Sequence, residues 1–467
     1  MDTLDLPGFL CDFILTDFEG DQSGEVVALG CSDIDSLSTR WGAIFGIKDD
    51  RFESSPRTSF DIPSEAVVFD AGDIDGDGSP EILYLASDGL YAMEIDGIAA
   101  SRPRLVIKTE TMFLFPTPKS VSHWDFYKST KVTGQSIILI PAIDVIRVYD
   151  FENGAVSGSH VIPFKTHGHA SRARIAENRA ARRLGFDFDL PFIDMLDYNG
   201  DGINDLYVIN DDGDIDIFTR SFDGDFSRQP AIHMAGAFGG DSNAETEVLA
   251  RDINGDGLGD LVVSRYTGGV KNLESKIEVY LCKTRGGHNR SPAFEHTIPN
   301  SAGVLFLSDI NHDGRSDIVI TAIRIGMTAM LKMLILNRVD LGLEVFLQQP
   351  GGTFPSTPSM SATMAVLADL NSGEINFAEN IAVKADFNGD SLRDFLIETG
   401  DGVLNIYYGV AGGIFETEPG WIYPLPKPSS ILAEDCDNDG ISEIFAFYND
   451  SPTDRDIIRV VHVGAGK

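Results

Sequence analysis

Seven short stretches of this sequence carry oxygen-bearing side chains at positions 1, 3, 5 and 9. The clearest has Asp386, Asn388, Asp390 and Asp394 at these positions, with Gly389 at position 4. Alternate side chains can turn inward, while the small residue at position 4 lets the backbone curl. Oxygen ligands at this spacing can surround one calcium ion, a hard cation that takes about six to eight oxygens at roughly 2.3–2.6 Å. We therefore interpret each stretch as a calcium-binding loop.

The same pattern recurs along the whole chain, and a fixed internal spacing that repeats is the strongest signal in the sequence. The pattern predicts about seven Ca²⁺ sites, and the alternative is a set of acidic turns that bind no metal. The remaining candidate ligands are Asp17, Glu19, Asp21 and Glu25; Asp73, Asp75, Asp77 and Glu81; Asp197, Asn199, Asp201 and Asp205; Asp252, Asn254, Asp256 and Asp260; Asp309, Asn311, Asp313 and Asp317; and Asp435, Asp437, Asp439 and Glu443.

The EF-hand is the main rival for an acidic loop of this kind, and the sequence argues against it. An EF-hand needs a bidentate Glu at position 12 and a helix on each side. Position 12 is instead apolar or aromatic in every copy, as in Val263, Ile320 and Ile397. The flanks are short β-type runs such as 304–307 and 318–320, which predict strands.

Composition limits the classes of partner and compartment. The 467 residues carry a formal charge of −36, but 43% are hydrophobic, which argues against a disordered acidic chain. The predicted loops hold 24 of the 72 acidic residues, so much of the acidity belongs to them. We expect no nucleic-acid partner, because phosphate contacts need a basic field. No apolar run reaches the ~18 residues of a membrane span, and the first residues do not resemble a signal peptide.

The spacing of the loops predicts eight structural units of four strands each. The loops begin at residues 17, 73, 197, 252, 309, 386 and 435, and the gap between 73 and 197 has room for a further unit. In that unit we expect 120–124 as the first strand and 125–129 in place of the acidic loop. Lys128 would repel a cation there, so we expect no calcium in this unit. Strands at 136–140, 145–149 and 156–164 would complete it.

A regular period with four strands per period favours an all-β fold, an eight-bladed β-propeller of four-stranded blades, over a sandwich or barrel. Seven blades are the alternative. The last unit supplies only three strands, and residues 3–7 match the ending of a fourth strand. We therefore expect the N-terminal strand to complete the last blade and close a single domain spanning residues 1–467, which removes an open sheet edge.

Long insertions at 165–185, 326–342 and 351–379 are predicted on the face opposite the calcium loops, because successive strands in a blade run antiparallel. Residues 169–184 are rich in Ala and contain five arginines, which predicts a helix. Those arginines could dock an anionic partner or pair with the protein's own carboxylates. The segment 326–342 contains Met327, Met330 and Met333 and could form a binding loop or pack over a blade.

The segment 384–416 has the order Ala-Asp-Phe-Asn-Gly-Asp, Asp-Phe-Leu-Ile, Leu-Asn-Ile-Tyr-Tyr-Gly and Gly-Gly-Ile-Phe. It resembles the calcium-binding FG-GAP/VCBS repeats of integrin α-subunit propellers and bacterial surface proteins. The chain lacks a clear Gly-Ala-Pro element, so it is more similar to the bacterial VCBS branch. The resemblance implies a propeller with calcium in its loops and an extracellular, cell-surface or periplasmic location.

From these patterns we expect a calcium-stabilised, non-enzymatic binding, adhesion or scaffold module. Its protein or glycan partner would bind the face opposite the calcium loops. No HExxH, GxSxG or P-loop motif occurs, so we assign no catalytic and no cofactor-binding residue. The alternative is an enzyme similar to polysaccharide lyases, some of which resemble calcium-containing eight-bladed propellers. Such an enzyme would need a base near a calcium-bound uronate.

Overall fold

The computed structural model describes residues 1–18, 22–33, 35–96, 99–114, 116–117, 119–130, 135–166, 168–174, 182–188, 192–210, 213–235, 245–268, 273–283, 287–288, 291–324, 327–367, 380–412, 414–449, 451 and 454–463. Contacts divide the chain into two compact units. The first comprises Met1–Leu190, Cys436–Asn438 and Phe447–Val460, and the second comprises Pro191–Asp435, Asp439–Ala446 and Val461–Lys467.

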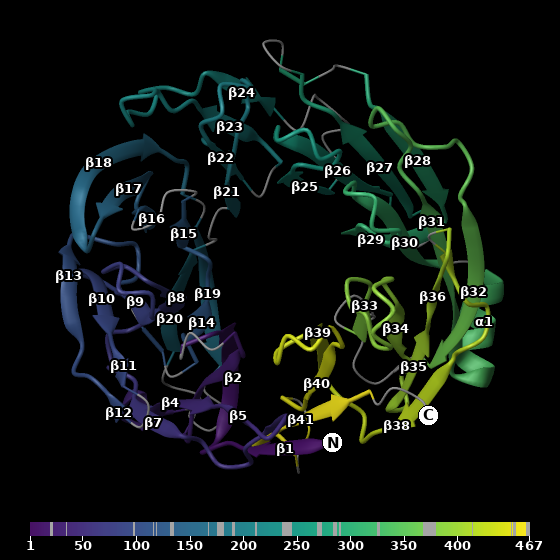
Figure 1. The fold of residues 1–467 in the computed structure, drawn as a ribbon, viewed down its shortest axis with the longest axis horizontal. Coiled ribbons are helices and arrows are strands. Elements are labelled where there is room, and N and C mark those ends of the chain that lie inside the picture. Colours follow the sequence, from purple (N-terminus) through teal and green to yellow (C-terminus); the bar gives the residue numbers. More distant parts are fainter. Residues whose placement is uncertain are drawn as a thin grey trace. The chain divides into compact units, whose positions relative to one another are not determined.

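In the described part of the chain, eight sheets carry the fold, all antiparallel apart from one short added strand, and their strands lie side by side in Figure 1. The predicted fold class, an all-β propeller of eight four-stranded blades, is confirmed, and eight sheets rule out the seven-blade alternative. Among the described residues, no helix is both long enough and apolar enough to span a bilayer.

Three sheets and three hairpins belong to the first unit, with one 3₁₀ turn at Leu37–Thr39. The sheets are β2 (Phe9–Thr16), β3 (Glu25–Cys31), β4 (Arg40–Phe45) and β7 (Thr58–Asp61); β8 (Val68–Gly72), β9 (Glu81–Ala86), β10 (Gly89–Met93) and β13 (Arg104–Lys108), with β14 (Ser122–His123) added; and β15 (Tyr127–Ser129), β16 (Gln135–Ala142), β17 (Val145–Glu152) and β18 (Ala155–Pro163). The hairpins pair β5 (Ile47–Lys48) with β6 (Arg51–Phe52), β11 (Ile95–Asp96) with β12 (Ala99–Ala100), and β19 (Gly168–Arg174) with β20 (Arg182–Phe188).

Four sheets, one hairpin and the helix α1 (Met327–Leu336) belong to the second unit. The sheets are β21 (Phe192–Leu196), β22 (Asp205–Ile209), β23 (Ile215–Phe218) and β24 (Ile232–Met234); β25 (Glu245–Arg251), β26 (Asp260–Thr267), β27 (Glu274–Tyr280) and β28 (Phe294–Pro299); β29 (Ser301–Ser308), β30 (Asp317–Arg324), β31 (Arg338–Phe346) and β32 (Met360–Leu367); and β33 (Ile381–Ala382), β34 (Phe395–Glu398), β35 (Val403–Tyr407) and β38 (Trp421–Pro424). The hairpin pairs β36 (Gly409–Val410) with β37 (Ile414–Phe415).

The eighth sheet joins the two ends of the chain. Its strand order is β1 (Asp2–Asp5), β41 (Ile457–His462), β40 (Glu443–Phe447) and β39 (Ser430–Glu434). The register of β1 and β41 runs from Asp2 opposite Val460 to Asp5 opposite Ile457. The expectation that the N-terminal strand completes the last sheet is confirmed.

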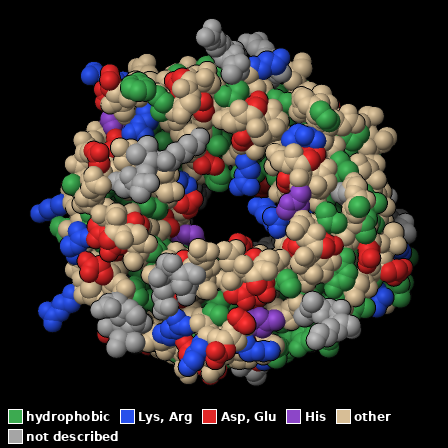
Figure 2. Space-filling model, viewed as in Figure 1, with side chains coloured by type: hydrophobic (Ala, Val, Ile, Leu, Met, Phe, Trp, Pro, Cys, Tyr) green, Lys and Arg blue, Asp and Glu red, His purple; other side chains and the backbone are tan. Residues whose placement is uncertain are grey.

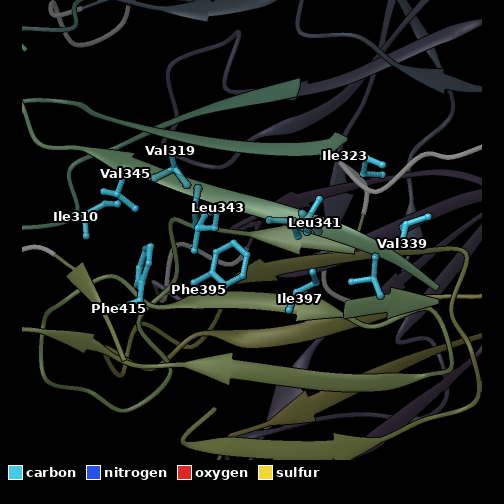
Figure 3. Close-up of a cluster of buried hydrophobic side chains, with 13 residues drawn as sticks. Ile310, Val319, Ile323, Val339, Leu341, Leu343, Val345, Phe395, Ile397 and Phe415 are labelled. Carbon is cyan, nitrogen blue, oxygen red and sulfur yellow. The ribbon is translucent and has the colours of Figure 1, made fainter. Parts of the chain in front are cut away.

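The second strand of each sheet forms most of the core. All residues of β3, β9, β22, β34 and β40 are buried, whereas the outer strand β18 is mostly exposed. The near-continuous apolar runs of these second strands follow from burial on both faces. Figure 3 shows one such layer, in which Val319, Leu341 and Leu343 from one sheet face Phe395 and Ile397 from the next.

Three insertion predictions need correction. The segment 165–185 is no helix where it is described, because β19 and β20 pair from Gly168–Phe188 to Arg174–Arg182. Helix propensity is a weak preference, and the hairpin satisfies the same backbone groups. Within 326–342, α1 is a helix and β31 already begins at Arg338. Within 351–379, residues 360–367 are the fourth strand β32, while 368–379 lie outside the described residues.

Candidate metal centre in the acidic loops

Each acidic loop connects the first strand of a sheet to the second. The loop 252–260 leaves β25 and enters β26, and Arg251 pairs with Asp260 across its base. The same pairing lies under the loops that end at Glu25, Glu81, Asp205 and Asp317. Strand pairing therefore closes each of these loops, and position 9 is the first residue of the second strand. Among the described residues, no helix flanks such a loop, whereas an EF-hand needs a helix on each side.

The carboxylate at position 1 holds the turn. Asp73 accepts backbone N–H groups from Gly76 at 2.6 Å and from Gly78 at 3.0 Å, one on each oxygen. Asp197, Asp252 and Asp386 accept the N–H groups of positions 4 and 6 in the same way. In Asp73 and Asp252 each oxygen keeps a second lone pair, whereas in Asp197 and Asp386 the oxygen that accepts position 4 also accepts the N–H of position 3. The other oxygen of Asp197 and Asp386 keeps a lone pair, so each of these side chains can fix the turn and still coordinate an ion.

Positions 4 and 6 adopt left-handed backbone wherever the structure describes them. At position 4, Gly76 has φ 81° and His312 has φ 55°. At position 6, Gly78 has φ 96° and Ser391 has φ 69°. This region favours glycine. The sequence predicted a backbone turn at position 4 but not the left-handed conformation at position 6. Glycine stands at position 6 in five of the seven copies, a signal that could have indicated it.

Position 9 is buried in all seven loops, between 0% and 4% exposed. The Asp394 carboxylate accepts the N–H of Phe387 at 2.7 Å and that of Gly409 at 2.7 Å. Asp205, Asp260 and Asp317 likewise accept one N–H from position 2 and one from beyond the third strand. The position 9 side chain therefore ties its loop to three strands, whatever else it binds.

Negative charge is concentrated at these buried groups. The pKa of Asp260 is raised to about 7. Burial is the largest cause, two backbone hydrogen bonds lower the pKa, and the charges of Asp256 and Asp252 add to the rise. The pKa of Glu81 is raised to about 7 by the same causes. The pKa values of Asp205, Asp317 and Asp394 are raised to about 6, again mainly by burial. Like charges in a buried site are costly unless a cation accompanies them.

Carboxylates converge in two loops whose position 9 is Glu. Asp73, Asp75 and Glu81 each offer an oxygen, and these oxygens all lie within 4.8 Å of one another. Asp435, Asp437 and Glu443 meet the same criterion. Two ligands of one calcium ion, each about 2.3–2.6 Å away, are at most roughly 5 Å apart. The residues present therefore fit a calcium ion.

The loop geometry agrees with the comparison against known families. A family model described as an FG-GAP-like repeat matches residues 197–263, from position 1 of one acidic loop into the second strand of the next sheet. The chain carries an FG-GAP-like repeat. The comparison with curated proteins found no match.

Solved structures that are similar to this chain are distant in sequence. Sqt1 from Chaetomium thermophilum is 11% identical with a TM-score of 0.46, covering 99% of this chain and 98% of that one. An Agrocybe aegerita lectin that recognises non-reducing terminal N-acetylglucosamine is 14% identical with a TM-score of 0.40, covering 90% and 81%. The biofilm matrix protein Bap1 of V. cholerae is 11% identical with a TM-score of 0.38, covering 99% and 88%.

Neighbouring acidic loops are linked through position 8 in the hydrogen bonds that follow. The N–H of Gly259 donates to the carbonyl of Asp197 at 2.8 Å, and the N–H of Ser316 donates to that of Ile253 at 2.8 Å. Ser442 donates to the carbonyl of Asp386 at 2.7 Å in the same manner. An ion bound in one loop would therefore order a segment that the next loop contacts.

The unit without an acidic loop differs from the predicted one. Its first strand is β15, and the expected strand 120–124 instead contributes β14, which pairs in parallel with β8 of the preceding sheet. Ser129 of β15 pairs with Ser136 of β16, so 127–129 belong to the first strand and not to the loop predicted at 125–129, and residues 131–134 lie outside the described residues. The sequence between these two strands, 130–134, contains no acidic residue. Parallel pairing to another sheet has no local sequence signal, which is why the prediction was wrong.

Most predicted ligands lie in loops of the geometry described above. Glu19 and Asp21 lie outside the described residues. Sequence reasoning also missed position 2, where Ile253, Ile310 and Phe387 are at most 1% exposed. The apolar character of position 2 could have indicated that its side chain anchors the loop in the core.

Proposed function

We propose that this chain is a calcium-stabilised β-propeller that acts as a non-enzymatic binding, adhesion or scaffold module for a protein or glycan partner. The observation that carries the calcium proposal is the convergence of Asp73, Asp75 and Glu81 within 4.8 Å. The recurrence of the same residues in seven loops extends it to about seven sites.

Calcium would supply positive charge where the chain concentrates negative charge. In the loop 73–81, the carboxylates of Asp73, Asp75 and Glu81 would hold the ion, and Asp77 is the further candidate at position 5. At millimolar calcium and a Kd of ~10⁻⁴ M, one site stabilises the folded chain by about 1.4 kcal/mol. An extracellular, cell-surface or periplasmic location would provide such a calcium concentration and is part of this proposal.

The surface supports a polar partner. Acidic and basic side chains are intermixed on the face shown in Figure 2, so the net charge of −36 does not make that face uniformly acidic. In each antiparallel sheet, the connection between the second and third strands leaves the end opposite the acidic loop. We propose that the partner binds at those ends, where connections vary while the metal loops stay alike.

The decisive measurement separates a metal role from a purely structural role of the loop carboxylates. We expect the melting temperature of the wild-type chain to rise in millimolar calcium relative to EGTA. Glu81→Gln keeps an oxygen that can accept the N–H of Ile74 but removes the charge. If Glu81 holds calcium, the variant binds about one ion fewer per chain by calorimetry and metal analysis, and its calcium-dependent rise is smaller.

Asp223→Asn is the matched control, because Asp223 is exposed and lies outside the seven loops. This control should keep the full calcium-dependent rise. A wild-type transition that is the same in calcium and in EGTA would refute the calcium proposal. If Glu81→Gln is destabilised equally in calcium and in EGTA, the Glu81 carboxylate serves only to accept a backbone hydrogen bond and does not hold calcium.

A further inference from the structure

An open pocket with a volume of about 520 Å³ lies in the first unit, and none of its lining residues belongs to an acidic loop. Its lining comes from three segments: Pro7 before β2, the paired strands β4 and β7, and the chain between β10 and β13. The hairpin strand β12 lies beside β7 and brings the third segment into place. The volume falls within the roughly 300–1,000 Å³ typical of small-molecule sites.

One part of the pocket wall is apolar and firmly held. Trp41 and Met93 are 6% and 2% exposed, and Phe60 is half-buried. The ring of Phe60 lies against Gly42, its partner on the neighbouring strand, so closely that a Cβ at Gly42 would be only 2.1 Å from the ring. The glycine therefore lets the ring lie on the sheet and fixes the shape of the wall.

The polar part of the lining carries two charges of opposite sign. Asp61 and Arg102 are both exposed, and in the described part of the chain neither side chain has a hydrogen-bond or ion-pair partner. Asp61 lies directly opposite Trp41 in the strand register, which places these two side chains on one face of the sheet, while Phe60 projects from the other face of the edge strand β7. The hydroxyl-bearing Ser59 also lines the pocket.

These groups together select a ligand. A sugar ring has an apolar C–H face that can lie on aromatic side chains, and hydroxyls that donate to a carboxylate and accept from a guanidinium. A proline-rich peptide offers carbonyl acceptors but few donors, which would leave Asp61 without a partner. A simple anion would be repelled by Asp61. We propose that this pocket binds one sugar residue of a glycan, which rests on the binding function proposed above and gives it a place and a ligand class.

Binding of free saccharides to the full chain in millimolar calcium tests the site. The probes are glucose, galactose, mannose, fucose, N-acetylglucosamine and glucuronic acid, with a proline-rich peptide beside them. Saturation-transfer NMR detects binding, and calorimetry measures affinity. We expect at least one saccharide to bind, and Asp61→Asn and Arg102→Ala each to weaken it by about tenfold or more, the effect of losing a hydrogen bond to a charged group.

Matched controls are Asp223→Asn and Arg104→Ala, both at exposed positions outside the pocket lining. They should leave the affinity unchanged, and all four variants should keep the wild-type melting temperature. The site is overturned if no saccharide binds, if the two pocket variants bind as the wild type does, or if they weaken peptide binding alone. A glycan bound with unchanged affinity by the pocket variants would overturn this pocket but leave the proposed binding function intact.

Discussion

At the residue scale, the three acidic side chains of the loop 386–394 accept backbone hydrogen bonds, whether or not a metal is bound. The Asp386 carboxylate accepts N–H groups from Asn388, Gly389 and Ser391, and Asp390 accepts that of Leu392. A nine-residue turn with this much internal bonding is pre-organised. Less entropy is then lost when an ion orders the loop, which favours binding.

Position 6 gives a direct test of the backbone argument. Ser391 has φ 69°, a region that favours glycine, whereas five other loops have Gly there. We expect Ser391→Gly to stabilise the chain by about 0.5–1 kcal/mol, because relief of the left-handed strain exceeds the entropy cost of glycine. Urea unfolding measures the change.

The same substitution at Ser79 serves as the control. Ser79 is the position 7 residue of the loop 73–81 and has no positive φ. Ser79→Gly should therefore cost stability, by roughly 0.5–1 kcal/mol. Destabilisation by Ser391→Gly of similar size would contradict the strain argument.

At the element scale, the short strand β14 connects three sheets of the first unit where an acidic loop is missing. The backbone N–H of His123 donates to Asp12 of β2 at 2.7 Å. Asp70 of β8 accepts the N–H groups of Phe126 and Tyr127 at 2.8 and 2.7 Å. The imidazole Nε2 of His123 lies 3.4 Å from Asp70. Hydrogen bonds and an ion pair here replace what metal loops would supply elsewhere.

This connection should depend on pH. Burial lowers the pKa of His123, but its hydrogen bond to Asp70 and the charges of Asp70, Asp12 and Asp125 outweigh burial and raise the pKa above its usual value. The ion pair therefore contributes fully below the unfolded pKa of about 6.5 and is lost as pH rises through the higher folded value.

His123→Gln tests the pH dependence. The variant should lose more stability relative to the wild type at about pH 5.5 than at about pH 8.5. Melting curves of both proteins at the two pH values give the comparison, and their difference removes the pH response of all other groups. A variant that differs from the wild type by the same amount at both values would show that the imidazole charge has no role.

At the scale of the whole molecule, the two ends of the chain share one sheet. Leu4 of β1 is fully buried opposite Ile458, and the N–H of Leu6 donates to the carbonyl of Asp456 at 2.8 Å. Asp2 adds an ion pair with Arg51 at 3.0 Å. Without β1, the edge of β41 would present unpaired backbone groups, which template aggregation.

We expect Leu4→Ala to lower the free energy of unfolding by about 2–5 kcal/mol, the cost of a cavity in a packed core. Asp5→Ala, at the exposed next residue, should change it by no more than about 0.5 kcal/mol. Urea unfolding measures both, and size-exclusion chromatography should show more aggregate for Leu4→Ala alone. Equal effects of the two substitutions would mean that β1 adds no stability to the last sheet.

The sequence by itself determined the period of the fold and the geometry of its turns. Asp252, Asn254 and Asp256 encode the shape of one turn, because their side chains accept the N–H groups of residues 255–258 next to them in the chain. The chain-end pairing was also readable, since the last unit visibly lacked a strand. The spacing of residues is enough to predict a turn when the hydrogen bonds that shape it join residues close together in the chain.

Only the tertiary structure decided what depends on distant neighbours. Residues 169–184 have good helix formers, yet the described part is a hairpin, because pairing with a partner strand overrides propensity. The strand β14 joined another sheet, and the lining of the pocket at Trp41, Asp61 and Arg102 was assembled from residues as distant in the chain as Pro7 and Pro103. Each of these depends on long-range packing, which leaves no periodic trace in the residues that take part.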